Sequence, residues 1–506
     1  MTQKVASSLI AELPVKEQVS RKHAVCVQHA GRVVTEAEHA AFLDELFHDT
    51  PGAPPHSERR TAAGGHHHHA RAQVAPFASL TAAILQLDSS TGKAPGHFVQ
   101  HILPRMVNHV LNFELFLPER LPILSELPHP ASSANATATT TVAISRRQCF
   151  AILSAAFLCA FPRSDHGSDG RMLEMPGINY HRMFHCPAHY AETQKLVMHF
   201  DYFTAIACQL LDNDSDAYVP LIDDPSNGLI LARMVVPSSS LKSEALTCQL
   251  IPLEVHPLKA GIDEQMALLR VDFANKYIGG GSLSQGCVQE EITFSICPEC
   301  NVSRYICEKI ADHEAILLLN AKVYSSIVPG SYGWTMKRLA AVDAALTPTP
   351  NVIVAVDAVP FQRGDPSQFQ PQSIQRELVK ALAGFQALPL AVLHWAPTLA
   401  EHSSLLSGIA TGTWGCGAFN GDVELKALIQ WIAASVSGRT MHYFPFDNEK
   451  VLQILPRLAA GLVAQKVTAG ALLACLTREA CHWVQQGMHL GRGSGIFDLV
   501  SEIFGI

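Results

Sequence analysis

Hydrophobic and polar positions follow a helical period in the first half of the chain. Between residues 76 and about 210, apolar residues recur at steps of three and four, as at Ile102, Leu103, Met106 and Val110. This spacing places them on one face of a helix. We therefore expect a helical accessory domain over residues 76–227. The apolar run 149–161 is shorter than the ~20 residues that span a bilayer, so it predicts a buried helix and no membrane partner.

From residue 228 the pattern changes to short apolar runs separated by helical segments. The runs are LILARMVV, CQLIPLEVH, ALLRVDFAN, EAILLLNAKVY, NVIVAVDAV and MHYFPF. Nearly continuous apolar runs are typical of strands that are covered on both faces. Helical patterns at 374–385 and 422–437 lie between them. Strands alternating with helices predict a layered α/β domain over residues 228–506.

Two segments interrupt these patterns. Residues 50–73 are rich in Pro, Gly, His and Ala without an apolar period, so residues 1–75 are predicted to be a flexible N-terminal segment. Residues 128–141 (PHPASSANATATTT) are predicted to be a second linker. The run His66–His69 could bind a metal adventitiously, but consecutive histidines are not held at a fixed ligand geometry. The lone CPEC motif at 297–300 lacks a second ligand pair and predicts buried thiols.

Composition and charge narrow the class of protein. Of 506 residues, 48% are hydrophobic and 16% are charged, which is typical of a globular chain. The net charge of −8 disfavours a general basic surface, so no direct nucleic-acid partner is expected. Thirteen cysteines without a recognisable signal peptide indicate reduced thiols, and we expect a location in the nucleus and/or cytoplasm.

Residues 272–291 read DFANKYIGGGSLSQGCVQEE, which is a predicted strand end, three glycines and then two adjacent acids. Glycines let a backbone approach a bound group closely. Acids just before an apolar stretch are also favourable at the start of a helix. The segment is therefore either a tight turn followed by helix-start acids or a ligand site with its own proton donor.

A second glycine-rich stretch, IATGTWGCGAFNGD, spans residues 409–422 directly before a predicted helix that starts around Val423. A loop of this kind at a helix N-terminus directs backbone N–H groups at an anion such as a diphosphate. No Lys-Ser/Thr pair follows, so it is not an ATPase or kinase loop. It could also be only a tight turn. In MHYFPF, Phe444 or Phe446 could stack on a base or belong to the core.

Together these stretches resemble the poly(ADP-ribose) glycohydrolase family. The resemblance rests on the stretches VDFANKYIGGG…QEE, HILPRMVNHVL, SRRQCFAILSAAFLCAFPR, PGINYHRMF, VIVAVDAVPF, QRELVKALAGF and ATGTWGCGAF, across roughly residues 95–450. It implies a macrodomain, which has α/β/α layers around a mixed sheet, preceded by a helical accessory domain. The implied reaction is hydrolysis of the ribose–ribose O-glycosidic bonds of poly(ADP-ribose), which releases ADP-ribose.

The resemblance also assigns roles at the acidic pair. Glu291 is implied to protonate the leaving 2′-oxygen and then to activate the attacking water. Glu290 and Asn275 are implied to orient the reacting ribose, and we expect Asp272 to brace the loop. A proton donor at neutral pH needs a carboxyl whose pKa lies well above the ordinary value near 4.3. Because an adjacent like charge raises a carboxyl pKa, side-by-side acids suit this role.

The remaining implied contacts hold the nucleotide. The residues implied to bind substrate are Asn275, Gln289, Gly280, Gly281, Ile262, Asp263, Tyr324, Thr413, Trp414, Gly415, Cys416, Gly417, Ala418, Phe419 and Phe446. The 413–419 loop takes the diphosphate, with Phe419 against a ribose. Asp263 accepts from the adenine amino group, and Phe446 stacks on the ring. The resemblance implies no cofactor and no metal.

Two positions depart from the family pattern. Thr413 stands where family members usually carry Asn, and Ile327 stands where the second tyrosine of a YSxY pattern contacts the ligand. Tyr324 remains, and nearby Tyr332 could substitute. Neither departure touches the acids, so we expect altered affinity rather than lost catalysis.

Three functions remain open on the residues alone. The first is the polymer hydrolase, whose partners are poly(ADP-ribose) and poly-ADP-ribosylated proteins and whose biological setting is the DNA damage response. The second removes mono-ADP-ribose from proteins, and the third is a non-catalytic macrodomain that only binds ADP-ribose. The adjacent acids favour catalysis, because a binding module needs no proton donor.

Overall fold

The computed structural model describes residues 21–22, 42–43, 45–47, 78–93, 96–117, 122–127, 139–161, 174–184, 190–212, 222–236, 245–258, 260–346, 351–386, 390–395, 407–490 and 495–506. Of the predicted flexible segment 1–75, only the first three of these short ranges are described, and they are helical. The His66–His69 run lies outside the described residues.

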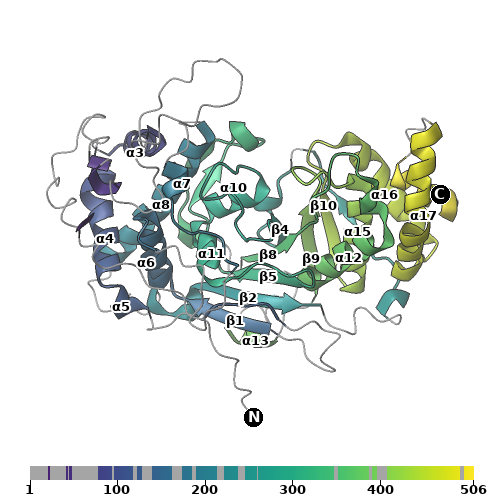
Figure 1. The fold of residues 1–506 in the computed structure, drawn as a ribbon, viewed down its shortest axis with the longest axis horizontal. Coiled ribbons are helices and arrows are strands. Elements are labelled where there is room, and N and C mark those ends of the chain that lie inside the picture. Colours follow the sequence, from purple (N-terminus) through teal and green to yellow (C-terminus); the bar gives the residue numbers. More distant parts are fainter. Residues whose placement is uncertain are drawn as a thin grey trace, which may run out of the picture.

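Helices lie before and after a set of parallel and antiparallel strands, so both the predicted helical region and the predicted α/β region are present (Figure 1). The α-helices are α3 (Ala78–Ser90), α4 (Leu103–Leu111), α5 (Phe113–Phe116), α6 (Arg146–Phe157), α7 (His181–Phe184), α8 (Tyr190–Asp212), α10 (Gln289–Ile296), α11 (Ser303–Ile306), α12 (Pro371–Phe385), α13 (Leu390–Trp395), α15 (Val423–Val436), α16 (Glu449–Ala464), α17 (Ala469–Leu490) and α18 (Ile496–Phe504). The strands are β1 (Thr139–Ile144), β2 (Leu229–Val235), β3 (Glu254–Val255), β4 (Leu269–Ala274), β5 (Glu314–Leu319), β6 (Ser325–Ile327), β7 (Arg338–Ala341), β8 (Val352–Asp357), β9 (Gly408–Gly412) and β10 (Thr440–Phe444).

Eight strands form one mixed sheet in the order β1-β2-β5-β8-β4-β9-β10-β3. The pairs β1–β2, β2–β5 and β5–β8 are antiparallel, whereas β8–β4, β4–β9, β9–β10 and β10–β3 are parallel. A separate hairpin is formed by β6 and β7. The mixed sheet with helices before it confirms the macrodomain-like architecture that the sequence predicts.

Strand β1 corrects one prediction. Residues 139–141 were expected in the 128–141 linker, but they begin β1, which pairs antiparallel with β2 from Thr139↔Met234 to Ile144↔Leu229. The physical reason is composition, because three threonines followed by Val-Ala-Ile are largely β-branched and favour a strand. The linker residues 128–138 lie outside the described residues. The predicted strand CQLIPLEVH is also shortened, since only Glu254–Val255 forms β3.

The central strands are buried on both faces, as continuous apolar runs predict. One side packs into a cluster with α6, α8 and α10, and the other packs into a cluster with α12, α15 and α17. Alternate strand residues divide between the two clusters, because side chains in a strand point to opposite faces. Those facing the first cluster are Leu229, Leu231, Ile316, Leu318, Ile353 and Ala355. Those facing the second are Ile230, Ala232, Met234, Leu317, Val352, Val354 and Val356.

Helix α8 of the predicted accessory domain is fixed to the later part of the chain by buried polar contacts. The Lys195 ammonium donates to the carbonyl oxygens of Ser284 and Gly286 at 2.6 Å each. It also donates to those of Gly281 and Ser282 at 3.3 and 3.2 Å. A buried ammonium with four carbonyl acceptors holds the 281–286 loop in one conformation.

Six residues further along α8, Asp201 binds the β6–β7 hairpin. Its carboxylate receives two hydrogen bonds from the Arg338 guanidinium, at 2.6 and 2.8 Å, and one from the Ser325 hydroxyl at 2.5 Å. Arg338 begins β7 and Ser325 begins β6. Helix α8 therefore positions both the 281–286 loop and the hairpin.

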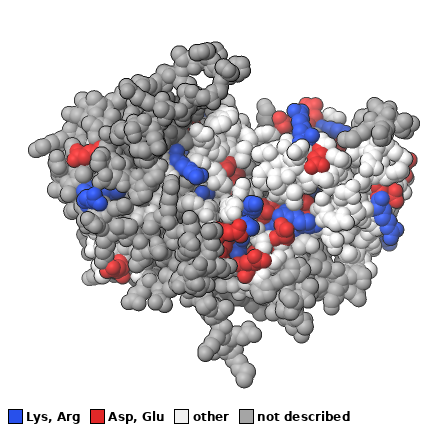
Figure 2. Space-filling view, viewed as in Figure 1, with Lys and Arg blue, Asp and Glu red and all other residues white. Residues whose placement is uncertain are grey.

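Figure 1 shows the early helices at the left of the molecule and the late helices at the right, with the strands between them. On the face drawn in Figure 2, the described basic and acidic side chains are interspersed. Within the described part of the chain, no helix combines the length and apolar character needed to cross a membrane.

Replacing Lys195 with methionine is expected to lower the free energy of unfolding by roughly 2–4 kcal/mol, because four buried carbonyls lose a charged donor. The measurement is urea unfolding followed by circular dichroism. Lys337, which is exposed, provides the matched control, and Lys337→Met should stay within about 0.5 kcal/mol of the parent. Equal midpoints for Lys195→Met and the parent would show that α8 does not hold the loop.

Candidate active site

The sheet topology brings the predicted site residues to one end of the parallel strands, the edge of the sheet formed by their carboxyl ends. Strands β8, β4, β9 and β10 are mutually parallel, so their carboxyl ends meet at the same edge of the sheet. Ligands bind at this edge in open α/β sheets. The acid-bearing helix α10 follows β4, the 413–419 loop follows β9, and Phe446 follows β10.

The two adjacent acids lie in the first turn of α10 and point back at the glycine loop. Glu290 is 2% exposed and accepts from the amides of Asn275 at 2.9 Å and Gly279 at 2.6 Å. Glu291 is 6% exposed and accepts from the amides of Gly281 at 2.8 Å and Val288 at 2.9 Å. Each carboxylate is thus oriented by two backbone donors rather than by bulk water.

Gly280 explains why this loop is glycine-rich. Its φ of +41° is one that side-chain-bearing residues rarely adopt. A Cβ at this position would lie 2.6 Å from Glu290 Oε2 and 2.7 Å from Glu291 Oε1. Both acids approach the backbone so closely here that only glycine fits, so the glycines and the acids form one structural unit.

Asp272, near the end of β4, is buried beneath the acids. Its side chain is fully buried, and neither carboxylate oxygen has a hydrogen-bond partner among the described residues. Burial raises the pKa of Asp272 well above its usual value, and the charges of Glu291 and Asp263 raise it further, while Arg270 opposes them. Asp272 therefore favours its protonated form, and among the described residues it forms no side-chain hydrogen bond that would brace the loop.

The pKa of Glu290 is also raised well above its usual value. Burial is the main cause, followed by the charges of Asp272 and Glu291, and the amides of Asn275 and Gly279 oppose the shift. Interacting carboxyls of this kind titrate as a group rather than singly. Asp272 and Glu290 therefore hold protons in a pH range where isolated carboxyls have lost them.

Gln289 fixes the start of α10 and connects it to Tyr332. Its side-chain oxygen accepts from the Phe273 amide at 2.8 Å, and its backbone amide donates to the Tyr332 hydroxyl at 3.1 Å. The Tyr332 ring lies 4.9 Å from the Phe446 ring. Burial raises the pKa of Tyr332 to about 12. Tyr332 thus joins the acid-bearing helix to Phe446, which is 46% exposed and available to a stacking partner.

The predicted adenine pair also lies at this edge. Ile262 packs against Ala410 and Phe444, near the ends of β9 and β10. The Asp263 carboxylate accepts from the Thr293 hydroxyl on α10 at 3.0 Å and lies 3.7 Å from Arg270. Asp263 therefore connects α10 to Arg270, the second residue of β4. Its pKa is raised, chiefly by burial.

The 413–419 loop turns sharply after β9. Amide hydrogen bonds from Cys416 to the Thr413 oxygen at 3.0 Å and from Gly421 to the Gly415 oxygen at 2.9 Å close it. Among the described residues, the amides of Gly417, Ala418 and Phe419 have no partner, and Gly417 and Ala418 are exposed. Successive free amides of this kind suit an anion.

The helix after this loop does not supply the anion site that the sequence suggests. Helix α15 begins at Val423 as predicted, but the Asp422 carboxylate caps it and accepts from the Leu425 amide at 2.8 Å. A carboxylate already occupies the helix N-terminus. The loop amides, rather than the helix end, are therefore the available donors.

Trp414 lies in the loop, but its side chain points into the core. It is 1% exposed, its indole N–H donates to the Val356 oxygen at 2.9 Å, and the Lys426 ammonium lies 4.0 Å above its ring. Lys426 forms a buried ion pair with Glu377. Trp414 thus anchors the loop, and its indole is not free to contact a ligand.

Tyr324 does not reach the site. Its ring is 1% exposed and its hydroxyl donates to Glu299 at 2.8 Å. Its backbone amide pairs with the oxygen of Ile296, the last residue of α10. The acids lie in the first turn of that eight-residue helix, five and six residues before Ile296, or roughly 8–9 Å along its axis at 1.5 Å per residue. Tyr324 is thus held in the core here, its substrate contact stays a prediction, and Tyr332 is the tyrosine that contacts the first residue of α10.

Other features lie away from the acids. Cys297 and Cys300 are buried free thiols, as predicted from the CPEC motif. A hollow of about 560 Å³ lies between α17 and α18 and contains none of the predicted site residues. A group with metal-ligating chemistry is formed by Glu254, His256 and His442 on β3 and β10. No sequence motif signalled it, because its members come from two strands far apart in the chain.

Two family models match the chain. Residues 240–453 match the macro domain fold of poly(ADP-ribose) glycohydrolase, and residues 91–221 match its helical domain. The matched ranges contain the sheet strands from β3 onward, α10, both glycine-rich loops and α8. They therefore contain the predicted site and the helix that braces it.

Several curated relatives are named poly(ADP-ribose) glycohydrolases. Poly(ADP-ribose) glycohydrolase 1 of Caenorhabditis elegans is 33% identical over 235 residues, which is 42% of this chain and 28% of the relative. Poly(ADP-ribose) glycohydrolase 1 of Arabidopsis thaliana is 27% identical over 471 residues, 78% of this chain and 81% of the relative. Probable poly(ADP-ribose) glycohydrolase 2 of Arabidopsis thaliana is 27% identical over 378 residues, 65% of this chain and 67% of the relative.

These matches agree with the mixed sheet, the helices before it and the acid pair on the glycine loop. The chain belongs to the poly(ADP-ribose) glycohydrolase family, whose named members are glycosyl hydrolases.

Proposed function

We propose that this chain hydrolyses the ribose–ribose O-glycosidic bonds of poly(ADP-ribose) and releases ADP-ribose, with Glu291 as the general acid and base. The observation that supports this most directly is the buried acid pair, oriented by four backbone amides of the glycine loop and helix start. Poly(ADP-ribose) and the proteins that carry it are then its partners. Residence in the nucleus and/or cytoplasm and a part in the DNA damage response belong to the same proposal.

The geometry favours one acid for both proton transfers. Ordinary glycosidases place two carboxyls about 5–9 Å apart on opposite sides of the scissile bond. Glu290 and Glu291 are neighbours that both face the 279–281 backbone, so they do not straddle a sugar. In the proposed reaction Glu291 protonates the leaving 2′-oxygen. The resulting carboxylate then takes a proton from the water that attacks the oxocarbenium-like sugar.

Burial and like charge raise the pKa values of two carboxyls in this group. Glu290 and Asp272 have raised pKa values, and the Glu291 charge contributes to both shifts. Each additional proton on this group relieves repulsion among its three carboxyls. A bound diphosphate would add negative charge and strengthen the same effect. The proposed donation through Glu291 therefore draws on a group in which Asp272 and Glu290 keep their protons to a higher pH than isolated carboxyls do.

The surrounding residues suit the rest of an ADP-ribose unit. The free amides of Gly417, Ala418 and Phe419 would take the diphosphate. Asp263 would accept from the adenine amino group, and Phe446 would stack on the ring. Among the described residues the Asn275 side-chain amide has no hydrogen-bond acceptor, so it can donate to a ribose hydroxyl next to Glu290.

Two alternatives are separated by substrate. A hydrolase of protein-linked mono-ADP-ribose would release nucleotide from mono-modified protein and leave the polymer intact. A binding module would release nothing from either. Incubating the purified chain with each substrate and quantifying free ADP-ribose by chromatography distinguishes the three.

Glu291→Gln is expected to lower the rate of ADP-ribose release from the polymer about 10³-fold, because an amide can neither donate nor regain the proton. The affinity for ADP-ribose, measured by calorimetry, should stay within a few-fold of the parent. Glu479→Gln, at an exposed position on α17, is the control and should release product at the parent rate. Release by Glu291→Gln at that same rate would refute the assignment.

Asp272→Asn tests the charge within the cluster. Because the pKa of Asp272 is raised in the folded state, its stabilising contribution is present below the unfolded value near 3.9. That contribution is lost as pH rises toward the folded value, at up to about 1.4 kcal/mol per pH unit. The variant should therefore gain more stability over the parent at pH 7.5 than at pH 5, measured by urea unfolding.

The matched control for this pH comparison is Asp447→Asn, at an exposed position. Its stability relative to the parent should be nearly the same at both pH values. A gain for Asp272→Asn that does not grow with pH would show that Asp272 is not a source of the charge repulsion.

Phe446→Ala is expected to weaken ADP-ribose binding about tenfold or more, since stacking on a base contributes roughly 1–3 kcal/mol. Calorimetric titration with ADP-ribose measures it. Phe446→Trp preserves a stacking surface and should bind within a few-fold of the parent. If Phe446→Ala binds as tightly as Phe446→Trp, the ring does not stack on adenine.

A further inference from the structure

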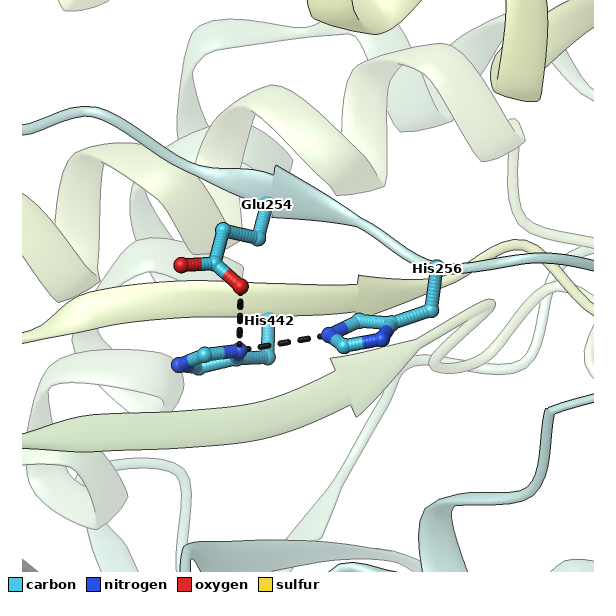
Figure 3. A group of neighbouring side chains, drawn as sticks. All are labelled: Glu254, His256 and His442. Atoms are coloured by element: carbon cyan, nitrogen blue, oxygen red, sulfur yellow. Dashed lines mark hydrogen bonds and ion pairs between the residues drawn. The ribbon is translucent and has the colours of Figure 1, made fainter.

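A cluster of two imidazoles and a carboxylate lies at the open edge of the sheet. Glu254 is in β3, His256 follows it, and His442 lies in β10. His442 is the register partner of Glu254 in the parallel β3–β10 pair. Because side chains two residues apart in a strand share a face, all three project on the same side of the two strands (Figure 3).

The separations of their ligand atoms match those around a tetrahedral zinc ion. His256 Nε2 lies 3.2 Å from His442 Nδ1, and His442 Nδ1 lies 3.3 Å from Glu254 Oε2. Metal–ligand bonds of about 2.0–2.1 Å at tetrahedral angles place neighbouring ligand atoms about 3.3 Å apart. All three atoms lie within 4.8 Å of one another, and Glu254 is 63% exposed, so its side chain is free to close the remaining distance.

Hydrogen bonds among the three side chains cannot satisfy all three of these atoms. His442 Nδ1 faces both a carboxylate oxygen and the nitrogen of a second imidazole. If Nδ1 carries a proton, it can donate fully to only one of the two; if it does not, it accepts from His256 and turns a lone pair toward the carboxylate. Both separations also exceed the usual 2.7–2.9 Å of a charge-assisted hydrogen bond. One cation among the three atoms would satisfy a lone pair on each of them.

We propose that Glu254, His256 and His442 form a binding site for a divalent cation of the zinc class. Two imidazole nitrogens and one carboxylate oxygen are ligands that zinc accepts, and they leave one position for water. Hard cations such as Mg²⁺ prefer oxygen ligands and fit this set poorly. The site is separate from the acid cluster, since β9 and β10 lie between β3 and β4 in the sheet.

The cation would secure the weakest strand of the sheet. β3 pairs with β10 over only two residues and forms the sheet edge. The His256 ring stacks on Phe444 at 4.2 Å with an interplanar angle of 3°, and Phe444 packs against Ile262. Holding His256 and His442 together therefore also fixes the end of β10 from which Phe446 projects.

The test measures zinc binding to the full chain by calorimetry, with His66–His69 replaced by Gln so that this run contributes no site. The same background carries either His256→Gln with His442→Gln, or Glu254→Gln alone. His482→Gln is the control, because His482 is an exposed histidine paired only with Gln486 among the described residues. Circular dichroism checks that each variant is folded.

We expect the background chain and His482→Gln to bind one zinc ion more per chain than the double variant. Glu254→Gln, a change at an exposed side chain, should weaken that binding at least tenfold and serves even if the double variant fails to fold. Visible absorption of the Co²⁺-loaded background chain should show a four-coordinate ion. Equal zinc stoichiometry and affinity in the background, double and Glu254→Gln chains would overturn the proposal. No poly(ADP-ribose) enters the experiment, so its outcome is independent of the proposed hydrolase activity.

Discussion

The site depends on the contact between two carboxylates and the backbone of a glycine loop. Glu290 and Glu291 bind amides that belong to the turn 279–281 and its flanks. This contact requires a residue without a side chain at Gly280. It also requires α10 to start at Gln289, so that both acids fall in the first turn. The position of both carboxyl groups is therefore fixed by main-chain geometry and varies little with side-chain rotamers.

The same contact affects which protonation state of the carboxyls is favoured. Backbone donors stabilise a carboxylate, whereas burial and the partnerless Asp272 favour the protonated form. Burial and repulsion outweigh the donors, so the pKa values of Asp272 and Glu290 are raised, in the direction that the proposed proton transfer needs. A surface pair of acids would lack the burial, and a single buried acid would lack the repulsion. Adjacent acids on a buried helix start provide both.

Sequence patterns predicted the parts of this arrangement that depend on local chemistry. Neighbouring residues determine the strand runs, the start of α15 at Val423 and the joint placement of the acids and glycines. Side-chain direction was not predictable in the same way. Trp414 and Tyr324 belong to ligand-binding stretches by their position in the chain, yet buried partners (the Val356 oxygen and Glu299) hold their side chains in the core. Those partners lie on other elements, so no local pattern contains them.

Helix α8 of the accessory domain fixes two segments near the acids that the sheet itself does not hold. Lys195 of α8 holds the loop that carries the glycines, and Asp201 of the same helix holds the hairpin that presents Tyr332. These two residues are six positions apart, or about 9 Å along the helix. One rigid helix thus sets the distance between the acid-orienting loop and the tyrosine that contacts Gln289 and Phe446. Ile327 lies in β6 of this hairpin, and the contacts of Tyr332 with Gln289 and Phe446 support the prediction that Tyr332 substitutes for the expected tyrosine.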